Sequence, residues 1–294
     1  RRRLPAARGA ADGGGGMSVI TTPTPWAGTV RRPERARLAR HSLYLTVRSL
    51  RTLLRQPAYV GATLVQPIIW LLLFGELFKN VVHLPGFTSQ SGTYLEFLTP
   101  GVIMMTALFS SGWAGTVYIQ DMERGVMDRL LASPVRRGAM MTGTLAYQAV
   151  TTFVQTVIVF GVAYAAGARF SGGAAGIGIT LLAAALLSVV MASFSNALAL
   201  LLRQHEALIG ISQFVTLPLQ FLSAAIMDLS LAATWIRDVA RYNPVNWAAV
   251  ASRDALSSGP AWGTVGTDLG LLAALALVMA WLATRAFGVY QRSV

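Results

Sequence analysis

The sequence predicts an all-α polytopic membrane protein with six transmembrane helices, and three observations support that prediction. Of its 294 residues, 54% are hydrophobic and only 12% are charged, whereas about a quarter of the residues in a soluble domain are charged. The mean hydropathy is +0.55. The apolar residues fall into runs of about 20, the length at which a helix crosses the roughly 30 Å hydrocarbon core of a bilayer.

The first 57 residues are predicted to precede the membrane domain. Residues 1–35 form a basic tail with little to bury, so we expect disorder there, and Met17 is a possible true start. Residues 36–57 are predicted to form an amphipathic interfacial helix with leucines broadly opposite its basic side. The basic side consists of Arg37, Arg40, Arg48, Arg51 and Arg55. Anchoring to lipid alone and an additional contact with a cytoplasmic partner both fit this helix.

Residues 58–284 are predicted to form the six-helix domain. The predicted spans are Ala58–Leu77, Tyr94–Ile119, Ala139–Ala166, Gly173–Leu202, Leu208–Met227 and Val265–Ala283. Basic loops stay in the cytoplasm, and an inside N-terminus puts 19 of the 24 Lys and Arg residues in inside segments. We therefore expect a bacterial cytoplasmic-membrane protein with both termini, the C-terminal tail 285–294 and the loop 120–138 in the cytosol.

The loop 120–138 concentrates charge between two apolar runs. It is predicted to form a short helix that ends at Pro134, which cannot continue one. An apolar stripe at a spacing of four is formed by Met122, Val126 and Leu130. Gly125 lies one helical turn before Arg129. Because glycine has no side chain, another protein surface can approach the helix closely there. A protein contact and a solvated basic loop both fit this pattern.

Two polar stripes are predicted within the spans. Span one carries Tyr59, Thr63, Gln66 and Trp70, and span five carries Gln213, Thr216, Gln220 and Ser223 beside Pro218. Because polar groups are costly in lipid, these faces should point at protein or water. Helix packing and a translocation path at a seam between two copies both fit the stripes.

The segment from Asp228 to about Gly263 lacks a continuous apolar run and contains aromatic residues that favour a membrane interface. Two interpretations stay open. The segment forms either short re-entrant helices in the last outer loop or an ordinary outer loop with aromatic anchors.

Three ordered motifs resemble the membrane subunits of ABC exporters of the type-2 permease class, such as daunorubicin-resistance-like drug exporters. The first is "YLEFLTPGV" at 94–102. The second is carried in the loop by Glu123, Gly125, Arg129, Leu130, Leu131, Pro134 and Arg137. The third, at 217–256, is carried by Pro218, Ser223, Trp235, Asn243, Pro244 and Arg253. The family often has proline directly before that tryptophan, where this chain has Ala233 and Thr234. The resemblance covers about Ala36–Val294.

The resemblance implies a permease that exports a hydrophobic, drug-like molecule by alternating access. It implies a loop, with Val126 in its apolar stripe, that docks on a cytosolic ATPase present in two copies. It also implies a second permease copy, with spans one and five at the interface. Export of a lipid-linked polysaccharide or teichoic acid is the alternative. The chain has no G-x-x-x-x-G-K-[ST] sequence, since its single lysine, Lys79, precedes Asn80. We therefore expect ATP and Mg²⁺ only in the partner subunit.

Other function classes leave features of the sequence unexplained. The net charge of +12 sits in segments that flank spans, so we expect lipid contacts and no nucleic-acid partner. With no cysteine and three scattered histidines, no metal-ligand spacing occurs. An intramembrane enzyme needs ionisable groups at mid-membrane, and Glu76, Glu96, Arg203 and Asp268 lie towards span ends. A channel without an ATPase leaves the patterned loop unexplained.

Overall fold

The computed structural model describes residues 57–80, 92–127, 137–226 and 228–290. Every regular element within these ranges is a helix, which suits a membrane because a helix satisfies its own backbone hydrogen bonds. These helices belong to the unit Arg35–Val294. The predicted tail and the predicted amphipathic helix, with all five of its arginines, lie outside the described residues except for residue 57.

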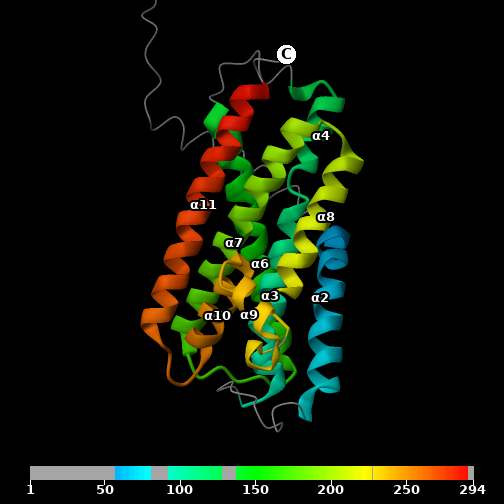
Figure 1. Cartoon of the computed structure of the whole chain (residues 1–294). Coiled ribbons are helices and arrows are strands. Elements are labelled where there is room, and N and C mark those ends of the chain that lie inside the picture. The colour runs from blue at the N-terminus through cyan, green and yellow to red at the C-terminus, as the bar shows by residue number, and fades with distance from the viewer. Residues whose placement is uncertain (1–56, 81–91, 128–136, 227, 291–294) are drawn as a thin grey trace, which may run out of the picture. The chain divides into compact units, whose positions relative to one another are not determined.

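Long helices and a group of short ones make up the described part of the chain (Figure 1). The long ones are α2 (Pro57–Leu77), α3 (Tyr94–Gly112), α6 (Arg137–Ala165), α7 (Gly173–Leu202), α8 (His205–Phe221) and α11 (Trp262–Tyr290). The short ones are α4 (Thr116–Glu123), η2 (Leu229–Leu231), α9 (Thr234–Ala240) and α10 (Pro244–Leu256).

Four of the six predicted spans are confirmed as helical stretches long and apolar enough to cross a membrane. Among the described residues these are Tyr94–Glu123, Met140–Ala165, Gly173–Leu202 and Trp262–Gly288. The fourth predicted span has the bounds of α7. The second is interrupted between α3 and α4. The sixth lies within the longer α11, which continues into the predicted tail as far as Tyr290.

The first and fifth predicted spans correspond to shorter apolar helices. The apolar part of α2 is Thr63–Leu77, and α8 has 17 residues, where a straight crossing needs about 20. The prediction that span five runs to Met227 is wrong beyond Phe221. There Ser223 Oγ donates to the Gln220 carbonyl at 2.7 Å and accepts from the Ala225 N–H at 3.3 Å, local bonds that compete with a helix.

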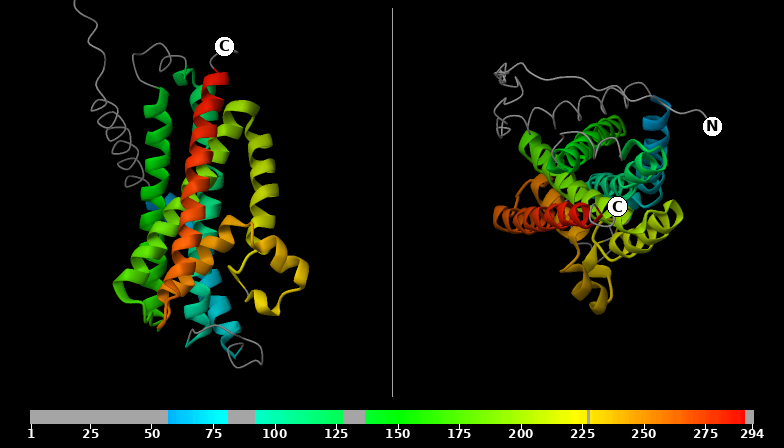
Figure 2. Two further views of the ribbon diagram at one scale, coloured as in Figure 1. Left: turned by 60° about the vertical axis from the view of Figure 1, so that its left-hand side comes forward. Right: turned by 90° about the horizontal axis from the view of Figure 1, so that it is seen from above.

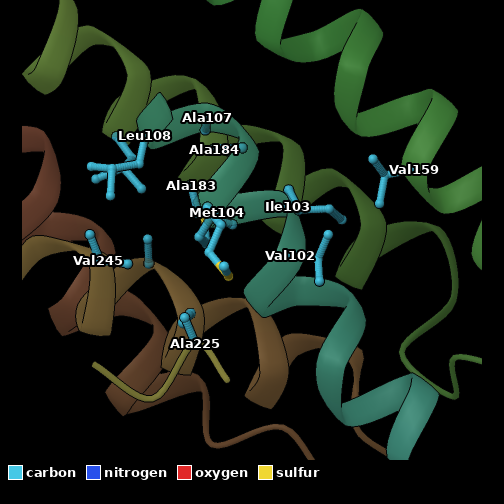
Figure 3. Packing of buried hydrophobic residues seen from close by; sticks show 14 of the residues in the cluster. Val102, Ile103, Met104, Ala107, Leu108, Val159, Ala183, Ala184, Ala225 and Val245 are labelled. Atoms are coloured by element: carbon cyan, nitrogen blue, oxygen red, sulfur yellow. The ribbon is translucent and has the colours of Figure 1, made fainter. Parts of the chain in front are cut away.

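Helix α7 is the central element, in contact with α3, α4, α6, α8, α10 and α11 (Figure 2). It carries many small residues, which let neighbouring backbones approach closely. Its fully buried Ala183 and Ala184 belong to one core with Met104 and Leu108 of α3 and Val245 of α10 (Figure 3). We call this core the main cluster.

A second buried cluster lies where α4, the start of α6, the end of α7, the start of α8 and the end of α11 meet. Its buried members are Tyr118, Ile119, Met127, Met140, Met141, Leu145, Ala192, Ala199, Leu200, Leu208, Ala283 and Phe287. The rings of Tyr118 and Phe287 pack edge to face with centroids 6.5 Å apart. We call this group the α4 cluster.

Candidate functional site

The interruption between α3 and α4 is held by one hydroxyl group of α7. Ser195 Oγ donates to the Gly112 carbonyl at 2.7 Å and accepts from the Gly115 N–H at 3.0 Å. A Cβ on Gly115 would lie 2.3 Å from the Ser195 carbonyl oxygen, so only glycine allows this approach. Ser195 is fully buried. A serine outside every sequence motif therefore bridges the two ends of the broken helix.

Helix α4 leads from this interruption to the predicted coupling loop. It ends at Glu123, which is exposed, and Gly125 has a φ of 63°, a left-handed conformation that terminates helices. The helix is therefore interrupted at Gly125, and residues 126 and 127 are helical again. The predicted helix end at Pro134 lies outside the described residues. Val126 is exposed, whereas Met127 is fully buried in the α4 cluster. Met127 anchors the loop, and the charged residues before it face outwards.

The remainder of the predicted loop is described only at its far end. Residues Arg129, Leu130, Leu131 and Pro134 lie outside the described residues. Arg137 is the first residue of α6, and its side chain is outside the described part. The contacts of these five side chains stay predictions.

A polar cluster joins α4, α6 and α7 one turn beyond the interruption. Tyr118 and Thr144 share a hydrogen bond of 3.0 Å between their oxygens. Asn196 Nδ2 donates to Thr144 Oγ1 at 3.5 Å, and Asn196 is fully buried. The two helices that flank the loop are therefore both tied to α7, at positions adjacent to Ser195.

The predicted stripe on α8 faces protein within a single copy. Thr216, Gln220 and Ser223 are buried, and Gln213 is half-buried. A Cβ on Gly112 of α3 would lie 3.5 Å from Thr216 Oγ1, so the stripe lies against α3 beside the helix interruption. The opposite face is apolar and exposed, and it consists of Ile211, Phe214, Leu217 and Phe221.

The predicted stripe on α2 divides between two environments. Thr63 accepts a hydrogen bond of 3.4 Å from Gln155 Nε2 of α6, and Trp70 stacks on Phe74 with centroids 4.8 Å apart. Gln66 is exposed among apolar side chains, which include Val65 and Ile69. Trp70 also packs against the main cluster. The structure therefore brings Thr63 and Trp70 into contact with the rest of the bundle and leaves Gln66 on the surface of the single copy.

A buried polar stripe on α6 was not predicted from the sequence. It consists of Gln148, Thr151, Thr152, Gln155 and Thr156, all buried. Gln148 Nε2 donates to Ser110 of α3 at 3.3 Å. The side-chain oxygens Thr152 Oγ1 and Gln155 Oε1 have no hydrogen-bond partner among the described residues. Steps of three and four residues would have indicated this stripe.

At the opposite end of the bundle, a turn at residues 222–226 is held by asparagines of α10. Asn243 Nδ2 donates to the carbonyls of Leu219 and Leu222, each at 2.7 Å, and its Oδ1 accepts from the Val245 N–H at 2.9 Å. Asn246 Oδ1 accepts from the Ala224 N–H at 3.0 Å. Pro244 occupies the first turn of α10, where a missing N–H costs nothing. Asn246 was not among the residues predicted from the sequence.

Arg253 fastens the same turn to α3. Its guanidinium donates to the carbonyls of Phe97 and Ala224, at 3.2 and 2.8 Å from Nη2, and stacks 3.7 Å from the Phe97 ring centroid. Burial lowers the pKa of Arg253 to about 10, and the carboxylates of Asp228 and Asp254 act in the opposite direction. Arg253 therefore stays protonated at neutral pH.

The motif at 94–102 supplies the surface that receives this turn. A Cβ on Gly101 would lie 1.7 Å from the Ala225 carbonyl oxygen, and Tyr94 Oη donates to the Ile226 carbonyl at 3.1 Å. Glu96 closes a capping box with Thr93 and accepts from the Arg169 N–H at 2.9 Å. Two motifs far apart in sequence thus form one structural unit.

The segment predicted to be re-entrant contains η2, α9 and α10. α9 begins at Thr234, directly after Ala233, so a helix starts here without the family's proline. Trp235 is 61% exposed, and α10 packs against α3, α7, α8 and α11. Short helices are present, and how deep they lie in a membrane stays a prediction.

Comparison with known proteins decides what kind of membrane protein this is. Residues 41–257 match the ABC-2 type transporter family, a stretch that contains the helix interruption and the turn described above. The chain belongs to the ABC-2 type transporter family. The resemblance predicted from the three motifs is thereby confirmed.

Individual relatives agree with this membership. The chain is 26% identical over 281 residues to the daunorubicin resistance ABC transporter permease protein DrrB1 of Streptomyces coeruleorubidus, which covers 92% of this chain and 96% of that protein. It is 30% identical over 196 residues to a Cyanophora paradoxa protein named as a transport permease, ycf38, over 66% of each chain. A Mycobacterium tuberculosis protein named as a doxorubicin resistance ABC transporter permease, DrrC, is 23% identical over 201 residues, 68% of this chain and 71% of that protein.

Family membership establishes the general role of the chain. ABC-2 permeases are multi-pass transport subunits that work with an ATPase subunit, and the long apolar helices of this chain agree with that role. The chain is accordingly a transport permease rather than an enzyme.

Proposed function

We propose that this chain is the permease subunit of an ATP-driven exporter of hydrophobic, drug-like molecules. The observation that carries the proposal is the exposed, charged end of α4 within a chain of the ABC-2 type transporter family. The two relatives named for daunorubicin and doxorubicin resistance favour a hydrophobic, drug-like substrate. A lipid-linked glycan is the alternative outcome of a transport assay.

The coupling site is proposed at the loop 120–138. Glu123 and Val126 project from the end of α4, while Met127 holds the segment to the α4 cluster. Buried Met127 fixes the position of the exposed charged and apolar side chains beside it. Such a fixed surface suits contact with a partner protein. We propose that each permease copy docks one of two cytosolic ATPase subunits there, which places both permease termini in the cytosol of a bacterial cell.

The translocation path is proposed between two copies of the chain, with α2 and α8 at the interface. The exposed amide of Gln66 on α2 supports this arrangement, since a polar group facing hydrocarbon is costly. The apolar faces of α2 and α8, with Ile69 and Phe214, provide large side chains for a partner surface. Alternating access then needs no catalytic residue in this chain.

The test is ATP-dependent daunorubicin uptake into inverted membrane vesicles that contain the chain and its ATPase subunit. Charge reversal by Glu123→Arg should abolish uptake while the chain still inserts, because the exposed carboxylate lies in the proposed contact. The matched control is Glu76→Arg, a reversal at an exposed glutamate of α2 beside Lys79, which should leave uptake unchanged. Wild-type uptake in Glu123→Arg contradicts the coupling site, and uptake of a lipid-linked glycan instead of daunorubicin contradicts the substrate class.

A further inference from the structure

We propose that the helix interruption at Gly112–Gly115 is a pivot that carries motion of the coupling loop to α7 and α8, and that Ser195 is its positioning residue. This inference rests on the proposed function, because it assumes that an ATPase subunit moves the loop. It adds a route and a residue that the sequence motifs do not contain.

The interruption between α3 and α4 is a turn held by its own hydrogen bonds. Trp113 has φ −101° and ψ 1°, and the chain crosses the break by tight i→i+3 bonds, from Ala114 to Ser111 and from Thr116 to Trp113, each 3.1 Å. A helix broken in this way loses axial continuity and bends more easily than an intact one. The Ser195 hydroxyl then joins Gly112 to Gly115, so α4 can tilt about a fixed point.

Along α3 and α4, the interruption separates the two buried clusters. Helix α3 contributes residues up to Leu108 to the main cluster, and α4 contributes Tyr118 and Ile119 to the α4 cluster. Helix α7 runs unbroken through both, with Met191 in the main cluster and Ala192 in the α4 cluster, and so do α6 and α11. Ser195 lies one turn beyond that change of cluster, where α4 and α7 meet.

Both ends of the coupling loop are connected to adjacent residues of α7. The incoming end is tied to Ser195 through Gly115, and the outgoing end to Asn196 through Thr144 of α6. Tyr118 of α4 closes the connection through Thr144. A force on the loop therefore reaches α7 at one place, whichever flanking helix transmits it.

The interruption also contacts the polar face of α8. The residue that accepts from Ser195, Gly112, also lies against Thr216 of α8. A second link runs through the chain, since only Arg203 and Gln204 separate α7 from α8 and Leu208 of α8 is fully buried in the α4 cluster. A displacement of α4 therefore moves α8, the helix that we propose to lie along the translocation path.

The experiment measures motion rather than transport, so it needs no assumption about substrate. Because the chain contains no cysteine, Phe214→Cys provides a single attachment site for bimane on the exposed face of α8. The labelled permease is purified with its ATPase subunit, and the bimane emission shift on addition of ATP and Mg²⁺ is recorded. The test variant is Ser195→Ala. The matched control is Ser188→Ala, which removes a buried hydroxyl of the same helix that donates to the Ala185 carbonyl at 2.8 Å.

We expect the ATP-dependent shift to fall by about tenfold in Ser195→Ala and to stay within about twofold of the parent in Ser188→Ala, on the scale of a lost buried hydrogen bond. Tyr118→Phe, which removes the second connection without a change of volume, should reduce the shift in the same direction. If Ser195→Ala does not fold, Tyr118→Phe still tests the pivot.

The outcomes separate the pivot from the proposed function. A parental ATP-dependent shift in Ser195→Ala or in Tyr118→Phe overturns the pivot and leaves the exporter proposal standing. An intact complex in which ATP hydrolysis produces no shift at Phe214 also overturns the pivot. A permease that binds no ATPase subunit overturns the proposed function itself.

Discussion

The side-chain amide of Asn243 donates to the main-chain carbonyl of Leu222 at 2.7 Å, across 21 positions of sequence. The same nitrogen also reaches Leu219, so one residue satisfies two of the four carbonyls that every helix end leaves unpaired. The amide oxygen caps α10 in return. One asparagine therefore ends α8 and begins α10, which explains why α8 stops short of a full crossing.

We expect Asn243→Ala to destabilise the protein more than any other single asparagine change in this segment. It leaves two carbonyls and one N–H unpaired in a site that is 4% exposed, and buried unpaired groups cost about 1–3 kcal/mol each. The unfolding temperature in detergent should fall by roughly 5–10 °C at the usual scale for this chain length. Asn80→Ala at an exposed position is the control, and equal unfolding temperatures for the two variants would contradict the capping role.

Gly101→Ala should destabilise the contact between α3 and the turn at 222–226. The new methyl group would meet the Ala225 carbonyl oxygen at 1.7 Å, so the turn must move. Gly161→Ala on α6 is the matched control, because a Cβ there meets nothing within 4 Å and alanine favours a helix by about 0.5–1 kcal/mol. Thermal unfolding should therefore shift in opposite directions, and a parallel shift would be evidence against the close approach.

The sequence predicted the long helices well because membrane spans are defined by composition. The α7 bounds follow from an apolar run between Gly172 and Arg203, and long-range contacts are not needed to find them. The prediction was wrong where a distant residue decides the backbone. The break at Trp113–Gly115 depends on Ser195, and the end of α8 depends on Asn243, which a local pattern does not contain.

The candidate sites show the same division. Polar spacing identified Thr216 and Gln220, but it could not tell that they face α3 inside one copy, because a helix pattern gives a face and not its neighbour. Gly125 was predicted to allow close approach of another surface within a helix. Its positive φ instead makes it the point where the helix is interrupted. Met127 was missed because the predicted apolar stripe consisted of Met122, Val126 and Leu130 and did not include the residue that is buried.

Gln155→Leu should leave the free energy of unfolding unchanged or raise it slightly. Gln155 is 3% exposed and its Oε1 has no partner among the described residues, and its bond to Thr63 is long at 3.4 Å. Replacing a poorly satisfied polar group by an apolar one of similar shape is nearly neutral. The informative comparison is Gln148→Leu, which removes the bond to Ser110. If Gln155→Leu lowers the unfolding temperature by more than about 5 °C, or roughly 2 kcal/mol, then Gln155 makes a stabilising interaction that these contacts do not include.

Arg253→Lys should destabilise the turn even though it keeps the positive charge. The guanidinium reaches the carbonyls of Phe97 and Ala224 together while it stacks on the Phe97 ring. An ammonium is a compact point charge without a planar fork. Hydrogen bonds from charged donors contribute about 1.5–3 kcal/mol, so the loss of one should lower the unfolding temperature by several degrees. Arg241→Lys, at a side chain that is 76% exposed, should have no measurable effect. Equal unfolding temperatures for Arg253→Lys and wild type would show that charge alone holds the turn to α3.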